Sequence, residues 1–220
     1  MRLLRKFTRF YLKKTGQHLH ESERLKKILD ANKSKYNKDS VFIETGSGLS
    51  TIQLSQFCDS IGTKAYSCDY NGEKLDSLRE KSPTKLDNIQ FLIGDSLGTL
   101  EDLSKNLSKV DFLFLDSAAS AIHTYREFQI LERFLSEGSL LLIDNAKLPS
   151  KWSPFEGTRK GKILVPYLLA HPFWDVSDFP KDGGSMVFAK MMSKPEYSNH
   201  AYEAPDYVDN WKKSFNKMLD

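Results

Sequence analysis

Five short apolar runs in the sequence each end in an acidic residue, namely Glu44, Asp69, Asp95, Asp116 and Asp144. The runs alternate with helical patterns at intervals of about twenty to thirty residues, which is typical of a parallel sheet with helices on its faces. Right-handed crossovers place the carboxyl ends of such strands at one edge of the sheet. Carboxylates gathered there repel each other unless a cation or a donor-rich ligand neutralises them. The sequence therefore predicts a binding site for such a ligand at this edge.

The first run leads into a glycine turn, Glu44-Thr45-Gly46-Ser47-Gly48, and Ser50-Thr51 then opens a helical pattern. Glycine lets the backbone approach a ligand where a Cβ would block it, so this stretch predicts the ligand end of a doubly wound domain. A dinucleotide places its pyrophosphate on such a turn, but the third glycine of its motif is Thr51 here, and Glu44 would face an anion. S-Adenosylmethionine has a sulfonium, an ammonium and no phosphate, so it suits the carboxylate better.

The turn resembles the Glu/Asp-x-Gly-x-Gly motif of the class I S-adenosylmethionine-dependent methyltransferases, and the resemblance covers about residues 40–190. It implies that Asp69 binds the ribose hydroxyls and that Asp95, followed by Ser96, lies against the adenine amino group. The cofactor contacts that it implies are Glu44, Gly46, Gly48, Ser50, Asp69, Asp95, Ser96 and Asp116. A plainer alternative also stands, in which Asp69, Asp95 and Ser96 are N-caps of the helices that follow them.

Asp116 after the fourth strand and Asp144-Asn145 after the fifth resemble the metal site of catechol O-methyltransferase and related cation-dependent enzymes. The resemblance implies that Asp116, Asp144 and Asn145 bind Mg²⁺ or Ca²⁺. Oxygen ligands suit both ions, and a bound ion would lower the pKa of an acceptor hydroxyl and orient it. The alternative is that these three are cap and turn residues.

The catechol-type enzymes carry a basic lysine three positions after the first metal aspartate, and this position is Ala119 here. His123 is the nearest substitute base, with Tyr125 beside it, so we predict His123 and Asp116 as catalytic residues. A solvated histidine at a helix start is the alternative.

The segment 146–162 is aromatic and basic, and we expect it to lie over the acceptor pocket and to close like a lid. Lys147, Trp152, Arg159 and Lys160 in this segment hint at an anionic or sugar-like acceptor.

The patterns predict a doubly wound, Rossmann-like α/β fold with a seven-stranded sheet, mostly parallel with an antiparallel last strand, helices on both faces and extra N-terminal helices. The expected strands are 41–45, 63–68, 89–93, 110–115, 139–143, 174–179 and 185–191, the last two forming a hairpin. The expected helices are 21–32, 49–60, 73–81, 97–107, 122–137, 161–170 and 207–218. Gly138 is expected to cap the helix over 122–137.

The 220 residues divide by composition into a basic helical extension (1–38), a cofactor-binding domain (39–192) and a tail with a short helix (193–220). Residues 1–14 are basic and amphipathic, which suits an anionic membrane surface or, alternatively, packing against the domain or the second subunit of a homodimer. A net charge of +3 is too balanced to predict nucleic-acid binding. No apolar run reaches transmembrane length. Cys58 and Cys68, outside any CxxC pair, favour a reducing, cytoplasmic location, with peripheral membrane contact as an alternative.

The leading hypothesis is an enzyme that uses S-adenosylmethionine to methylate a hydroxyl of a small-molecule acceptor, with or without a divalent cation. One alternative is a metal-independent methyltransferase that acts on nitrogen or on a macromolecule. Another is a dinucleotide-dependent oxidoreductase, which Glu44 and Thr51 disfavour. A third is a non-catalytic member of the fold that binds the cofactor or a partner.

Overall fold

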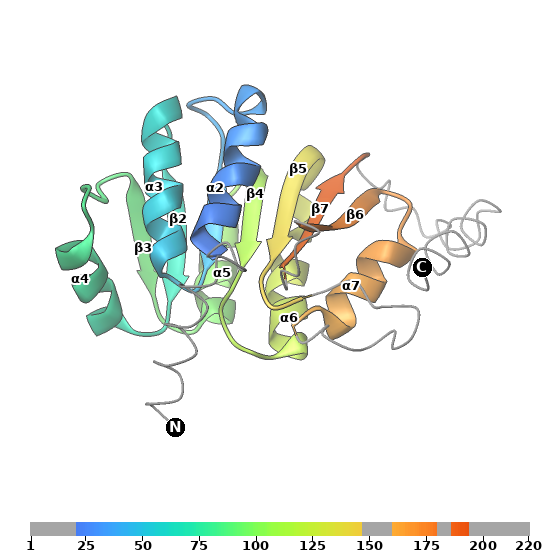
Figure 1. The fold of residues 1–220 in the computed structure, drawn as a ribbon. Coiled ribbons are helices and arrows are strands. Elements are labelled where there is room, and N and C mark those ends of the chain that lie inside the picture. Colours follow the sequence, from blue (N-terminus) through green and yellow to red (C-terminus); the bar gives the residue numbers. More distant parts are fainter. Residues whose placement is uncertain (1–20, 147–159, 180–185, 194–220) are drawn as a thin grey trace, which may run out of the picture.

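A computed structural model describes residues 21–146, 160–179 and 186–193 of the chain (Figure 1). The strands are β1 (Phe42–Thr45), β2 (Ala65–Asp69), β3 (Ile89–Ile93), β4 (Val110–Leu115), β5 (Leu135–Ile143), β6 (Trp174–Phe179) and β7 (Met186–Met191). The helices are α2 (Glu21–Ala31), α3 (Leu49–Ile61), α4 (Gly72–Lys81), α5 (Ser96–Ser104), α6 (Ala121–Leu131) and α7 (Gly161–Ala170), with short 3-10 helices η1 (Lys33–Lys35) and η2 (Glu132–Phe134). The expected helices over 1–14 and 207–218 and most of the expected lid lie outside the described residues.

The strands form one sheet in the order β3-β2-β1-β4-β5-β7-β6. β1 pairs in parallel with β2 and β4, β2 with β3, and β4 with β5. β7 lies between β5 and β6 and is antiparallel to both. The predicted seven-stranded, Rossmann-like sheet with an antiparallel last strand is therefore confirmed. The strand order reverses between β1 and β4, which is the point where doubly wound folds bind their ligands.

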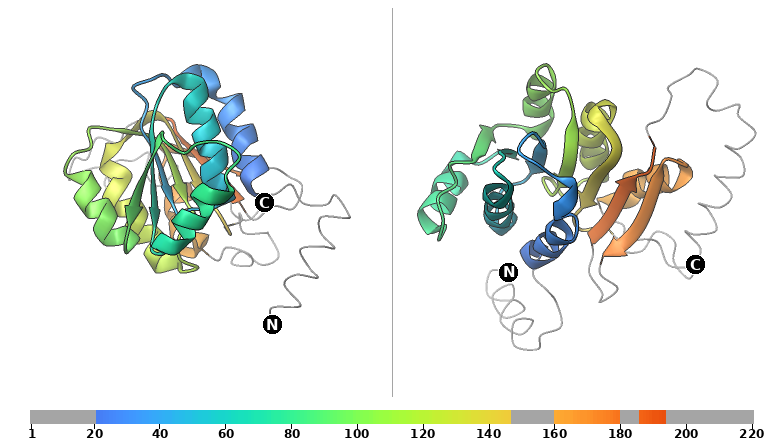
Figure 2. Two further views of the ribbon diagram at one scale, coloured as in Figure 1. Left: turned by 90° about the vertical axis from the view of Figure 1, so that its left-hand side faces the viewer. Right: turned by 90° about the horizontal axis from the view of Figure 1, so that it is seen from above.

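Helices cover both faces of the sheet (Figure 2). On one face, α2 and α3 pack over a buried cluster that includes Phe42 and Leu54. On the other, α5, α6 and α7 pack over a second cluster that includes Leu100, Phe128 and Leu164. Full burial of one such side chain stabilises a fold by about 1.5–3 kcal/mol. The two clusters therefore fix the strand ends from both sides.

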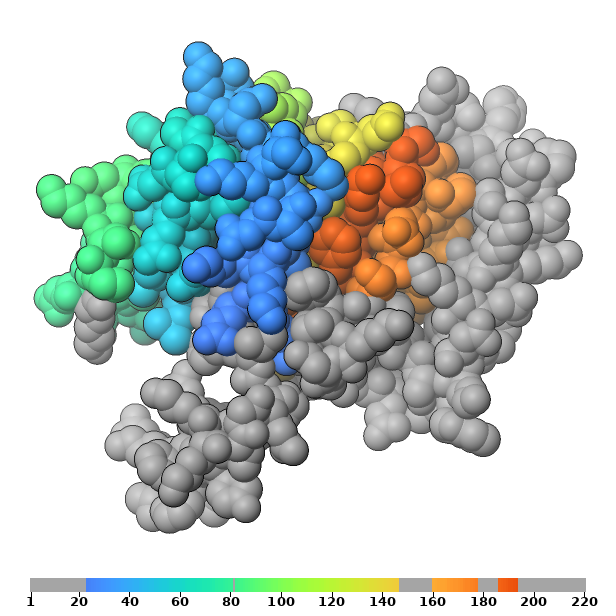
Figure 3. All heavy atoms as spheres, turned by 45° about the horizontal axis from the view of Figure 1, so that its top comes forward, coloured from blue at the N-terminus to red at the C-terminus, as the bar shows by residue number. Residues whose placement is uncertain are grey.

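The helix before the sheet, α2, is part of this core. Leu25 and Leu29 are fully buried and belong to the same cluster as Phe57 of α3. Figure 3 shows α2 lying alongside α3 on the surface of the molecule. Residues 21–31 thus share the core of the domain, and the predicted boundary at residue 38 stays a prediction. None of the described helices is long and apolar enough to cross a membrane.

The sequence prediction is wrong at the end of α6. The helix expected over 122–137 ends at Leu131, η2 follows, and β5 begins at Leu135. Gly138 has a φ of 89° but lies inside β5, beside the shift in register with β4 between Val110 and Phe112. Glycine adopts this backbone conformation without strain. Gly138 therefore allows the irregular pairing of β5 with β4 and does not cap the helix.

Candidate functional site

The glycine turn after β1 lies directly against the end of β4. Gly46 has a φ of 85°, and its N–H donates to the carbonyl oxygen of Cys68 at 2.7 Å. A Cβ at position 46 would lie 2.4 Å from the carbonyl oxygen of Asp116, whereas a Cβ on Gly48 would meet nothing within 4 Å. Gly46 is therefore required by the close approach of two strand ends, in addition to any approach of a ligand.

Glu44 is completely buried behind this turn. Its carboxylate accepts hydrogen bonds from Thr51 Oγ1 at 2.6 Å, from Ser67 Oγ at 2.8 Å and from Ser50 Oγ. Burial raises the pKa of Glu44 from 4.5 to about 7, although the three hydroxyls act in the opposite direction. The carboxylate predicted to attract a sulfonium thus ties the turn to α3 and β2.

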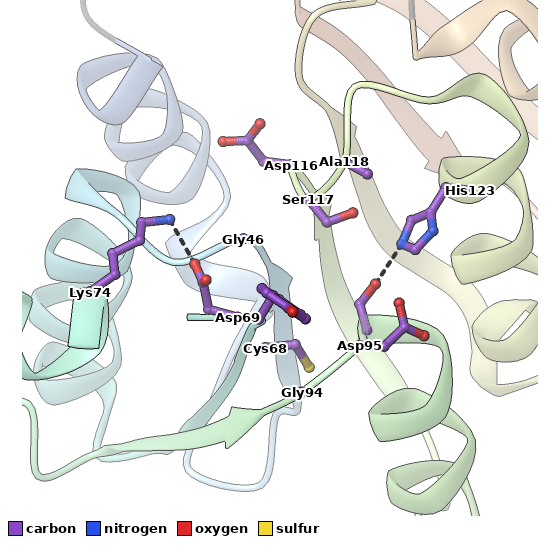
Figure 4. A pocket seen from close by; sticks show the side chains of 12 residues that line it. Gly46, Cys68, Asp69, Lys74, Gly94, Asp95, Asp116, Ser117, Ala118 and His123 are labelled. Carbon is purple, nitrogen blue, oxygen red and sulfur yellow. Dashed lines mark hydrogen bonds and ion pairs between the residues drawn. The ribbon is translucent and has the colours of Figure 1, made fainter. Parts of the chain in front are cut away.

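An open pocket of about 340 Å³ lies at the carboxyl ends of β1 to β4 (Figure 4), a size within the usual range of small-molecule sites. Of the predicted site residues, it is lined by Gly46, Asp69, Asp95, Ser96, Asp116 and His123. Glu44, Gly48, Ser50, Asp144 and Asn145 are not among its lining residues. Six of the predicted positions therefore come together around one cavity, although they come from four strand ends and a helix.

Asp69, at the end of β2, holds the pocket in shape. Its Oδ2 accepts from the backbone N–H of Ser47 at 2.8 Å and from Lys74 Nζ at 2.6 Å, and its Oδ1 accepts from the N–H of Asn71 at 2.9 Å. Asn71 is the N-cap of α4, so Asp69 is not the simple helix cap of the alternative interpretation. The next residue, Tyr70, is 84% exposed and also lines the pocket, although it is not among the site residues predicted from the sequence.

Asp95, after β3, is the N-cap of α5, because its side chain accepts from the N–H of Gly98 at 3.3 Å. The capping interpretation is therefore correct for Asp95, although the residue also lines the pocket. Ser96 turns inward instead and is 8% exposed.

A buried glutamate of α6, Glu127, underlies this side of the pocket. Ser96 Oγ and Ser117 Oγ each donate to its Oε1 at 2.5 Å, and Thr45 Oγ1 donates to its Oε2 at 3.3 Å. Burial is the main cause that raises the pKa of Glu127. Glu127 is not among the site residues predicted from the sequence. Its spacing of four from His123 was the available signal, because residues i and i+4 share one face of a helix.

His123 lines the pocket with its ring tied to this network. Its Nε2 lies 2.7 Å from Ser96 Oγ and 3.3 Å from Glu127 Oε1. A serine hydroxyl has one hydrogen, and Ser96 gives it to Glu127, so Ser96 accepts from an Nε2–H. In the neutral ring, Nδ1 is then the basic nitrogen. The geometry thus supplies an oriented histidine, as a general base requires.

The three predicted metal ligands lie at the ends of β4 and β5. Lys160 Nζ forms an ion pair with Asp116 Oδ1 at 2.6 Å. The side-chain amide of Asn145 donates to Asp144 Oδ2. Asp144 is 1% exposed and Lys160 is 3% exposed. Within the described part of the chain, no group of three or more His, Cys, Asp or Glu side chains is arranged to hold a metal ion.

The fold and the pocket together define a class I methyltransferase architecture. Residues 43–146, which include every residue that lines the pocket, match a family model described as a methyltransferase domain. Over these residues the chain thus resembles the class I methyltransferases, as the glycine turn and the strand-end acids predicted. A comparison with curated protein sequences gives no match.

Three solved structures illustrate the likeness in fold. An O-methyltransferase from Bacillus cereus in complex with SAH is 16% identical, covers 80% of this chain and 83% of that protein, and has a TM-score of 0.60. The O-methyltransferase TomG from Streptomyces achromogenes in complex with SAM is 14% identical, with coverages of 80% and 82% and a TM-score of 0.61. The MycE methyltransferase of the mycinamycin pathway, in complex with Mg, SAH and mycinamycin VI, is 14% identical over 78% of this chain and 50% of that protein, with a TM-score of 0.51.

The buried Glu44 predicts a pH dependence of stability. Its pKa is about 7 in the folded protein and near 4.5 when exposed, so the folded state holds a proton that the unfolded state releases between these values. Its contribution to the free energy of unfolding is largest below pH 4.5 and is lost as pH rises through 7, by about 3 kcal/mol in total. The difference in unfolding free energy between wild type and Glu44→Gln, measured by urea denaturation from pH 4.5 to 8, should fall across this window. A constant difference would contradict the raised pKa.

The two glycines of the turn should differ sharply on substitution. Gly46→Ala combines a positive φ with a clash against backbone, so we expect a loss of about 2–4 kcal/mol in stability. Gly48→Ala is the matched control, because its backbone is extended and the space around it is open. Thermal denaturation of both variants measures the difference. Equal melting temperatures would show that the turn does not depend on contact with β4.

Proposed function

We propose that this protein transfers a methyl group from S-adenosylmethionine to a hydroxyl group of a small-molecule acceptor. The observation that carries the proposal is the pocket at the ends of β1 to β4, which lies in the segment matched by the methyltransferase model. Neighbours in fold that are O-methyltransferases in complex with SAM or SAH support the same cofactor and a hydroxyl acceptor.

The charge of the pocket favours this cofactor over a dinucleotide. Asp69, Asp95 and Asp116 line it with three carboxylates, and Lys74 is the one lysine among its described lining residues. Lys74 pairs with Asp69 and Lys160 with Asp116, so one negative charge remains in excess. This charge attracts a sulfonium and an ammonium and repels a pyrophosphate. The preference first assigned to Glu44 thus comes from other strand ends.

His123 is the base that this arrangement supports. In the transfer, the acceptor oxygen bonds to the methyl carbon while the bond from that carbon to sulfur breaks, and its electron pair stays on sulfur. The hydroxyl proton leaves to a base, and Nδ1 of His123 is the nitrogen that Ser96 and Glu127 leave available. Glu127 acts as a positioning residue, because it fixes the ring from beneath the pocket.

A divalent cation at Asp116, Asp144 and Asn145 does not fit the contacts of these residues. Asp116 already carries the ammonium of Lys160, and Asp144 accepts the amide hydrogen of Asn145. A metal ion binds to lone pairs of its ligands. In Asp116 and Asp144, carboxylate oxygens already accept hydrogen bonds from Lys160 and Asn145. The acceptor side therefore works with the charges of the chain itself.

We also propose a cytoplasmic location and a diffusible acceptor. Cys58 and Cys68 are both buried free thiols, which supports a reducing compartment. Contact of residues 1–14 with a membrane surface or a second subunit stays a prediction, because this segment lies outside the described residues.

Cofactor choice is tested by isothermal titration with S-adenosylhomocysteine and with NAD. We expect binding of the first alone. Asp69→Ala should weaken binding by about 10- to 100-fold, because it removes a charged acceptor for the ribose hydroxyls. Asp76→Ala, an exposed carboxylate of the same helix region, is the control and should bind like wild type. Absence of S-adenosylhomocysteine binding in the wild type would contradict the proposal.

The base is tested with His123→Gln in a screen of phenolic, sugar and hydroxy-acid acceptors, with release of S-adenosylhomocysteine as the measurement. We expect kcat to fall by about 10²- to 10⁴-fold while cofactor affinity changes little, since the ring acts on the proton of the acceptor. His171→Gln, on the C-cap of α7, is the matched control. An unchanged kcat in His123→Gln would remove the histidine from the mechanism.

A further inference from the structure

A buried lysine from far along the chain contacts Asp116, one of the residues that line the pocket. Lys160 is 3% exposed, and its ammonium lies 2.6 Å from Asp116 Oδ1. Asp116 lines the pocket and is 24% exposed. Lysine is almost never fully buried without a partner, because removing its charge from water is costly. The ion pair therefore fixes one positive charge at the end of β4.

The backbone around Lys160 holds the ammonium in this position. Its N–H donates to the carbonyl oxygen of Asn145 at 3.2 Å. The next residue, Gly161, packs so closely that an added Cβ would lie 2.8 Å from the Cβ of Ala146 and 2.6 Å from a methyl carbon of Val165. The start of α7 therefore packs against the turn that follows β5. From there the side chain of Lys160 extends to Asp116 at the end of the neighbouring strand β4.

We propose that the ammonium of Lys160 takes the place of a divalent cation at the acceptor site. It lies at hydrogen-bonding distance from Asp116, the first of the residues whose types suggested Mg²⁺ or Ca²⁺, and the backbone N–H of Lys160 bonds to Asn145, the third. An ammonium has three N–H donors, and Asp116 accepts one of them among the described contacts. The remaining donors and the positive charge suit an acceptor oxygen, which a cation would otherwise orient.

This inference rests on the proposed function, and it specifies a metal-independent acceptor site with lysine as the positive group. The donors of Lys160 impose no octahedral geometry, so the acceptor needs one oxygen at the ammonium and not a chelating pair. A single hydroxyl beside the transferred methyl group is then sufficient. The proposed acceptors therefore include simple phenols and alcohols as well as catechol-like diols.

The test uses Mn²⁺ as a probe, followed by electron paramagnetic resonance on the full chain. In wild type, the ammonium of Lys160 occupies the position beside Asp116, so Mn²⁺ should bind weakly. Added Mg²⁺ should then leave the Mn²⁺ signal unchanged. Lys160→Met keeps most of the length of the side chain and removes its charge, so Asp116 loses its ion-pair partner. We expect Mn²⁺ affinity to rise at least about tenfold in this variant, since oxygen ligands suit the ion. Adding Asp116→Asn to Lys160→Met should abolish the gain.

Two controls keep the result interpretable. Lys162→Met removes an exposed lysine of the same helix and should leave Mn²⁺ binding at the wild-type level. S-Adenosylhomocysteine affinity, measured on every variant, reports whether the fold and the cofactor pocket are intact. Lys160→Arg keeps a positive charge and should not gain Mn²⁺ affinity. If Lys160→Met does not fold, Mn²⁺ binding by the wild type is compared with Asp116→Asn, and the inference then requires weak binding by both.

Two outcomes would overturn the inference. One is tight Mn²⁺ binding by the wild type that Asp116→Asn removes, because the position would then hold a metal despite the lysine. The other is a folded Lys160→Met that gains no Mn²⁺ affinity, because the lysine would then not stand in a cation position. Neither outcome affects S-adenosylhomocysteine binding, whereas failure of the proposed function appears as loss of that binding in the wild type.

Discussion

The structure depends on how carboxylates are neutralised at one edge of the sheet. The parallel strands bring the acids at their ends to the same edge, where mutual repulsion would separate the strands. Each acid has a donor from the chain itself, which for Asp144 is the side-chain amide of Asn145. Glu44 receives hydroxyls, Asp69 receives backbone N–H groups and Lys74, Asp95 receives a helix N–H, and Asp116 receives Lys160. These internal partners allow the edge to exist before any ligand binds.

The same neutralisation builds the walls of the pocket. Glu127 collects hydroxyls from the ends of β1 and β4 and from the start of α5, so one buried carboxylate joins three chain segments. A buried acceptor with several donors is rigid, because each lost bond would leave a polar group unsatisfied. His123 is oriented as part of this set. The pocket thus owes its shape to polar bonds beneath it and its position to the two apolar clusters beside it.

Sequence patterns predicted the strand ends well and the direction of individual side chains poorly. The succession of β1 to β7 along the chain and the pocket position of Asp69 and Asp116 follow from periodicity and from the rule that strand ends gather at one edge. Periodicity does not say whether an acid such as Glu44 faces a ligand or the core, because that depends on hydroxyls from two other elements. The helix cap expected at Gly138 failed for a similar reason, since positive φ serves strands as well as helices.

The cofactor half and the acceptor half of the site differ in how their partners are distributed along the chain. Asp69 and Asp95 are satisfied by residues two to five positions on or by the adjacent turn, so a local motif carries their roles. Asp116 is satisfied by Lys160, 44 residues later, across the whole of β5 and the following segment. A motif that stops at the end of β5 contains the carboxylates but not the cation that pairs with them. Two chains with the same acids can therefore differ in the positive group they use, and the start of α7 decides which group this chain has.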